Sequence, residues 1–173
     1  GLAGVYPMAF EDLWGTAQTY TYAVTNPSNS IDSAFNNLLA SSTGPLGGST
    51  ARNWTFTAID DTVLSAVAKV DLELRLYMTG WVNDTYYIQV FDNTNPACTA
   101  GWCTVYILDY LPASTIETQP PSTLTTLTIP VTSILNTIGR VNAAQVRITG
   151  SGVTAGGADT VTVYIDGVRL HVL

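Results

Sequence analysis

The closing stretch of the chain, residues 159–173, constrains the fold more than any other segment. Apolar and polar side chains alternate on both sides of Asp166-Gly167, but the phase of the alternation changes there. The apolar residues of the two sets are Val161, Val163, Ile165, Val168, Leu170 and Val172. Because successive side chains of a strand point to opposite faces, an uninterrupted strand would turn the second set away from the first. One extra residue, a β-bulge, returns both sets to one face, so the sequence predicts a bulged closing strand.

A second segment, residues 70–78, alternates without interruption and predicts a strand with one buried face. Its apolar members are Val70, Leu72, Leu74, Leu76 and Met78, and its outward members are Asp71, Glu73, Arg75 and Tyr77. Shorter strand-like segments cover residues 16–25, 53–59, 86–91, 104–110, 124–131 and 141–149. Turn residues separate them, and the one helical turn that we predict spans residues 131–138, with Ser133 as its N-cap.

About eight to ten short strands with almost no helix indicate an all-β fold. We predict a single antiparallel β-sandwich, jelly-roll-like, over residues 14–173. Residues 1–13 form an apolar lead before it.

The charge of the chain narrows the classes of partner. Six basic and thirteen acidic residues give a net charge of −7, and only 11% of the residues are charged. A nucleic-acid or anionic-membrane surface needs clustered cations, so neither partner is expected. No apolar run approaches the roughly 20 residues that span a bilayer. We expect that Gly1 is the N-terminus left by removal of a signal peptide, with removal of an initiator methionine or renumbering as the alternative.

The two cysteines, Cys98 and Cys103, lie five positions apart. A lone Cys-x4-Cys pair with no nearby histidine suits zinc poorly, since zinc takes four ligands. It suits a disulfide that closes a hairpin tip, with two buried free thiols as the alternative. A disulfide would imply an oxidising compartment, so we expect a secreted, extracellular or cell-surface protein.

Two motifs resemble jelly-roll carbohydrate-binding modules. Phe10-Glu11-Asp12 is similar to the Phe-Glu-Asp near the start of many of them, and Tyr164-Ile-Asp-Gly-Val-Arg-Leu170 is similar to their closing strand. The resemblance implies a β-sandwich, with no cofactor or only a structural calcium ion. Carried over to this chain, the calcium ligands would include Glu11 and Asp166, with Asp12 as a further candidate. The alternative is that Asp166 only accommodates the bulge and that Glu11 is solvated.

No catalytic set is evident, and we predict that the protein is not an enzyme. His171 is the only histidine, and it fits a rim or core position better than a general base. Sugar binding would instead use aromatic side chains as stacking platforms. The candidates for that role are Trp81, Trp102, Tyr77 and Tyr87, followed by Tyr106 and Tyr110.

The apolar lead suggests a different role, as a strand donated to the open sheet edge of a second copy. The side chains that would insert are Leu2, Val5, Met8 and Phe10. Head-to-tail exchange of this kind yields filaments, whereas a lead that folds back onto its own domain does not.

Two triplets, beginning at Asn53 and Asn83, match the pattern for N-glycosylation. From the sequence alone we predict a structural subunit of an extracellular filament or surface array. It would be a homo-oligomer or polymer that carries glycans. The alternative prediction is a carbohydrate-binding module that uses exposed aromatic residues.

Overall fold

The computed structural model of the chain describes residues 9–19, 41–43, 52–81, 83, 85–92, 98, 100–150 and 160–173. Within them the chain forms ten strands and one short helix, which confirms the predicted all-β class. The strands are β1 (Glu11–Thr19), β2 (Ser41–Thr43), β3 (Arg52–Phe56), β4 (Val70–Thr79), β5 (Thr85–Phe91), β6 (Trp102–Asp109), β7 (Glu117–Thr118), β8 (Thr125–Pro130), β9 (Gln145–Gly150) and β10 (Thr160–Val172). The helix is α1 (Ile138–Asn142).

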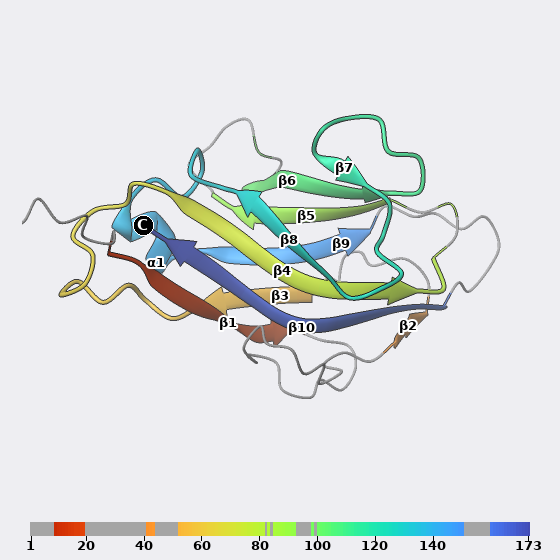
Figure 1. Ribbon diagram of the computed structural model, residues 1–173, viewed down its shortest axis with the longest axis horizontal. Helices are drawn as coiled ribbons and strands as arrows, with labels where there is room; N and C mark the ends of the chain where they lie inside the picture. The colour runs from red at the N-terminus through yellow and green to blue at the C-terminus, as the bar shows by residue number, and fades with distance from the viewer. Residues whose placement is uncertain are drawn as a thin grey trace, which may run out of the picture.

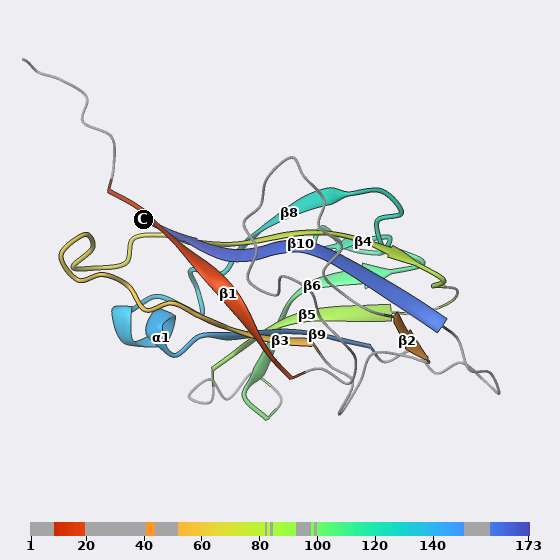
Figure 2. The same cartoon turned by 90° about the horizontal axis from the view of Figure 1, so that it is seen from below.

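The strands form one curled sheet in the order β7-β6-β5-β9-β3-β1-β10-β4-β8, with β2 also paired to β10 (Figure 1). Seen from below, β8, β4 and β10 make one layer, and β6, β5, β9 and β3 make the other (Figure 2). Strand β1 joins the layers, because its first half pairs with β10 and its second half with β3. All pairs are antiparallel except β6 with β7.

The parallel pair makes the sheet mixed, so the prediction of a purely antiparallel sandwich is corrected here. The chain turns back after Asp109, and the backbone N–H of Ile107 donates to the carbonyl of Ile116 at 2.9 Å. Glu117 and Thr118 then pair with β6 and run parallel to it. This segment was expected to be only a connector.

The predicted bulge in the closing strand is confirmed. Ile165 pairs with Leu76 and Gly167 with Arg75, which leaves Asp166 as the extra residue. Val163 and Ile165 before the bulge are buried, and so are Val168, Leu170 and Val172 after it, as the phase change required. The bulge also buries the carboxyl group of Asp166 completely, with Oδ2 lying 3.6 Å from Nε of Arg75.

The core lies between the two layers. The five apolar side chains of β4 are fully buried, which confirms the predicted inward set. Asp71, which was predicted on the solvated face, is only 9% exposed, so the prediction is wrong at that position. Trp54 of β3 is the largest buried side chain and is 1% exposed. It faces Gly15 of β1, where an added Cβ would lie 3.2 Å from Cδ1 of Trp54 and from the carbonyl oxygen of Val168. The packing therefore leaves little room for a side chain at Gly15, where β1 changes partner.

The helical turn predicted over residues 131–138 is correct only in part. The chain does turn after Val131, whose carbonyl accepts from the N–H groups of Ile134 and Leu135. The helix itself begins later, at Ile138, and its N-cap is Thr137 rather than Ser133. Oγ1 of Thr137 accepts from the N–H of Arg140 at 3.1 Å, which satisfies one of the unpaired donors of the first turn.

Candidate functional site

The outward face of β5, β6 and β9 carries a group of polar and aromatic side chains. This group results from the alternation of side chains along each strand. The core-facing residues are Ile88 and Val90 of β5 and Val146 and Ile148 of β9. The side chains between them point outward. We call this group the Trp102 surface; it consists of Gln89, Phe91, Trp102, Thr104 and Arg147.

Hydrogen bonds connect the Trp102 surface across three strands. Nε of Arg147 donates to Oε1 of Gln89 at 2.7 Å, and Nε2 of Gln89 donates to Oγ1 of Thr104 at 3.1 Å. The guanidinium carbon of Arg147 lies 4.1 Å from the centre of the Trp102 ring. Partial burial lowers the pKa of Arg147, although an arginine stays charged at any physiological pH. The surface thus holds a cation over the face of an aromatic ring.

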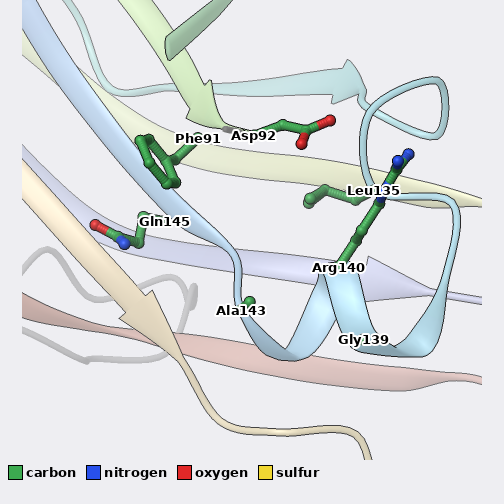
Figure 3. Close-up of a pocket in the computed structure, with 7 residues that line it drawn as sticks. All are labelled: Phe91, Asp92, Leu135, Gly139, Arg140, Ala143 and Gln145. Carbon is green, nitrogen blue, oxygen red and sulfur yellow. The ribbon is translucent and has the colours of Figure 1, made fainter. Parts of the chain in front are cut away.

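A pocket of about 320 Å³ opens where the Trp102 surface reaches α1 (Figure 3). It is lined by Phe91, Asp92, Leu135, Gly139, Arg140, Ala143 and Gln145. Figure 3 shows Phe91 beside Gln145 on one side and the charged ends of Asp92 and Arg140 on the other. Phe91 belongs to both regions, because its ring also meets the Trp102 ring edge-on at 5.1 Å. We call this cavity the Phe91 pocket.

A tight turn holds Phe91 in place. The predicted disulfide between Cys98 and Cys103 is present and links the later part of the β5–β6 connection to the second residue of β6. Just before β6, Ala100 and Gly101 have φ angles of 51° and 85°, and the carbonyl of Gly101 accepts from the N–H of Asp92 at 2.6 Å. The backbone of Gly101 passes so close to the Phe91 ring that a Cβ there would lie 2.6 Å from Cε2.

Gly101→Ala is therefore expected to destabilise the protein and to displace Phe91. A side chain at positive φ costs about 1–3 kcal/mol, and the clash with the ring adds to that cost. Gly139→Ala is the matched control, because a Cβ at Gly139 meets nothing within 4 Å. It lies in α1, where alanine is favoured over glycine by up to about 1 kcal/mol. Urea unfolding of both variants measures the effects, and equal midpoints would contradict the close approach at Gly101.

The aromatic residues predicted to bind sugar are divided between the two layers. Trp102 lies in the candidate site. Tyr87 lies on the same outward face of β5 as Gln89, two positions earlier in the strand. Trp81 packs against the hydrophobic core instead. Tyr77 lies on the outward face of β4 and stacks on Tyr164 of β10, with ring centres 4.3 Å apart. Desolvation, and secondarily the neighbouring Tyr164, raise the pKa of Tyr77.

The structure does not bring the two predicted calcium ligands together. Glu11 pairs with Val172, six positions along β10 from Asp166, which corresponds to about 20 Å at roughly 3.3 Å per residue. The carboxylate of Glu11 accepts from the N–H of Asp60 at 2.9 and 3.1 Å. Within the described residues, no three His, Cys, Asp or Glu side chains gather as a metal site requires. Calcium binding stays a prediction.

The lead and the glycosylation triplets are only partly described. Leu2, Val5 and Met8 lie outside the described residues. Phe10 is 52% exposed, and its ring lies 5.1 Å from that of His171. β1 begins at Glu11 and pairs with β10 of the same chain, so an exchanged segment would end before this residue.

The two asparagines of the glycosylation triplets lie in different settings. Asn53 lies within β3, between β1 and β9, and Asn83 is exposed between β4 and β5. Glycosylation at both positions stays a prediction.

A second polar group covers the outward face of β1, β10 and β4. Arg169 lies 2.7 Å from Oε2 of Glu73 and 3.5 Å from Oδ2 of Asp12. Nδ1 of His171 lies 2.6 Å from Oδ1 of Asp12, and the guanidinium of Arg169 lies 5.1 Å from the Trp14 ring centre. Arg169 is therefore paired with carboxylates of the protein itself. This pairing accounts for Glu73 of β4 without a ligand.

The residues of the site that we did not predict are Gln89, Phe91, Asp92, Arg140, Gln145 and Arg147. A signal for Arg147 exists in the sequence, because it stands between the inward residues Val146 and Ile148 in a chain with only six basic residues. The pocket has no such signal, since α1 and the end of β5 meet only in three dimensions.

Comparison with known proteins gives structural likenesses only. No protein-family profile matches the chain, and no curated protein is significantly similar to it. The structure is similar to SGBP-B from a complex xyloglucan utilization locus in Bacteroides uniformis, with 16% identity and a TM-score of 0.49. That match covers 93% of this chain and 46% of the other.

Two further solved structures resemble this chain. One contains a xylogluco-oligosaccharide and matches at 16% identity and a TM-score of 0.43, over 93% of this chain and 36% of the other. The second comprises domains CD of another protein, at 14% identity and a TM-score of 0.44, over 93% and 62%. This chain thus spans less than two thirds of each. Among the described residues, the single helix, α1, is too short to cross a membrane.

Proposed function

We propose that this protein binds glycans without catalysis, through the Trp102 surface and the adjoining Phe91 pocket, on a jelly-roll-like β-sandwich. The observation that carries the proposal is the pairing of the Trp102 and Phe91 rings beside a pocket with polar walls. The apolar face of a sugar ring packs on aromatic rings, and its hydroxyl groups need donors and acceptors nearby. Gln89, Gln145 and Asp92 supply both kinds of group next to these rings.

The same proposal includes an extracytoplasmic location. The disulfide between Cys98 and Cys103 favours an oxidising compartment, where extracellular glycans are met. The alternative role as a filament subunit depends on the exchange of residues 1–8, which lie outside the described residues. No contact within the described residues favours that role, so glycan binding is the function that we put forward.

Binding to a panel of soluble neutral and acidic polysaccharides tests the proposal, by affinity electrophoresis and then by titration calorimetry. At least one glycan should bind, and Trp102→Ala should weaken that binding about 10–100-fold, as for an interface hot spot. Tyr77→Ala removes an aromatic side chain from the opposite layer and should leave the affinity unchanged. A protein that binds no glycan, or that loses affinity through Tyr77→Ala alone, would refute the proposed site.

A further inference from the structure

The basic residues of this acidic chain differ in the partners that they have. Lys69 lies 3.4 Å from Asp71, Arg75 lies 3.6 Å from Asp166, and Arg169 contacts two carboxylates. Arg147 differs from all three. Its partners in the described residues are the amide of Gln89 and the ring of Trp102, and neither carries charge.

The guanidinium of Arg147 is also held in a fixed orientation. Nε donates to Gln89, and the guanidinium carbon lies over the Trp102 ring, 4.1 Å from its centre, so two contacts restrain one group. Gln89 is itself held by Thr104. The two terminal nitrogens have no hydrogen-bond partner among the described residues. A guanidinium presented in this way can donate two parallel hydrogen bonds to a carboxylate, with little loss of conformational freedom.

Partial burial of this cation adds to the argument. Desolvation lowers the pKa of Arg147, which means that its surroundings disfavour the charge. The neutral partners in the protein offset little of this cost. An anionic ligand would offset more of it, because charge-assisted hydrogen bonds are roughly twice as strong as neutral ones.

The surroundings of Arg147 favour an anionic sugar over other anions. A nucleic acid requires several cations to neutralise its phosphates, and this surface presents Arg147 in a chain of net charge −7. Trp102 and Phe91 offer rings to an apolar face, while Gln89 and Gln145 suit hydroxyl groups. A single carboxylate attached to a sugar ring matches one cation, two aromatic rings and neutral amides together.

We propose, on the basis of the glycan-binding function inferred above, that the Trp102 surface selects glycans containing uronic acids. The guanidinium of Arg147 binds the carboxylate, and the sugar ring packs against the aromatic residues beside it. Arg147 is thus the specificity-determining residue of the site, and the Phe91 pocket receives a neighbouring part of the glycan.

Matched ligands test this selectivity. Polygalacturonate, glucuronoxylan and alginate are each compared with their carboxyl-reduced forms, in which the uronic acid becomes a neutral sugar. Titrations are run in 0.15 M NaCl, where the Debye length of about 8 Å limits repulsion between the acidic protein and a polyanion. The affinity for at least one acidic polymer should be higher than that for its reduced form by a factor of about 10 or more.

Three variants complete the experiment. Arg147→Gln should weaken binding of the acidic polymer about 10–30-fold and binding of the reduced form by a clearly smaller factor, so that the preference for the acidic form is lost. Arg147→Lys keeps the charge without the planar fork and should fall between Arg147→Gln and the unaltered protein. Lys69→Gln changes the net charge by the same amount, at an exposed side chain just before β4. It should have no effect on the affinity for either polymer.

The possible failures are distinguishable. If acidic and reduced polymers bind equally and Trp102→Ala weakens both, glycan binding stands and the inference about uronic acids is wrong. An equal effect of Lys69→Gln and Arg147→Gln would show non-specific charge attraction and would also overturn it. If no polymer of either kind binds, both the proposed function and this inference fail.

Discussion

Replacing Trp54 with alanine is expected to lower the free energy of unfolding by about 3–5 kcal/mol. Trp54 is 1% exposed and contacts Gly15, where β1 passes from one layer to the other. Truncation would leave a cavity at this junction, which the neighbouring backbone cannot fill without moving. Typical domains are stable by only about 5–15 kcal/mol, so much of the protein's stability depends on this one ring. Urea unfolding followed by far-UV circular dichroism measures the loss.

Two variants control this measurement. Trp54→Phe keeps an aromatic ring in the core and should cost clearly less than Trp54→Ala. Trp102→Ala removes the same side chain from a partly exposed position and should also cost less, since it leaves no buried cavity. If Trp54→Ala and Trp102→Ala destabilise the protein equally, Trp54 is not the centre of the core.

Arg75→Met is expected to destabilise the protein by about 3–5 kcal/mol at neutral pH. The carboxyl group of Asp166 is fully buried in the bulge, and Arg75 is the cation beside it at 3.6 Å. Removing that cation leaves a buried negative charge with much less compensation. The cost is far larger than for an ion pair between two solvent-exposed side chains, whose median worth is about 0–1 kcal/mol.

A double-mutant cycle separates this effect from lost packing. Asp166→Asn removes the charge but keeps the shape of the bulge. The double variant Arg75→Met with Asp166→Asn should therefore be more stable than Arg75→Met alone. The coupling energy of the cycle should be about 1–3 kcal/mol. If the second substitution adds to the loss instead, charge compensation does not explain the role of Arg75.

The strand pattern was predictable where alternation is strong. β4 and β10 are accurately foreseen, bulge included, because a period of two along many residues leaves little freedom in choosing the buried face. The change of partner along β1 was not foreseen. It depends on Gly15, whose missing side chain permits close approach of Trp54 and the carbonyl of Val168. Such a contact is long-range and has no local signature.

The candidate site was less predictable than the fold. Aromatic character selected Trp102 and Tyr87 as candidates for sugar binding. The same criterion also selected Trp81, which packs on the core. Composition cannot distinguish an aromatic ring on a surface from one beneath it. Arg147 acquires its significance from Gln89 and Trp102, on strands that the sequence does not place beside β9.

The position of β10 bears on how the chain folds. β10, which follows every other described strand in the sequence, lies between β1 and β4, and Glu11 at the start of β1 pairs with Val172 near the end of β10. Until β10 emerges, both neighbours keep an unpaired edge, and such edges invite association with other chains. Pairing between residues so far apart in the sequence also slows folding, because the chain loses the entropy of loop closure before the contacts between the strands form. The facing edges of β1 and β4 are therefore covered only once β10 has been added between them.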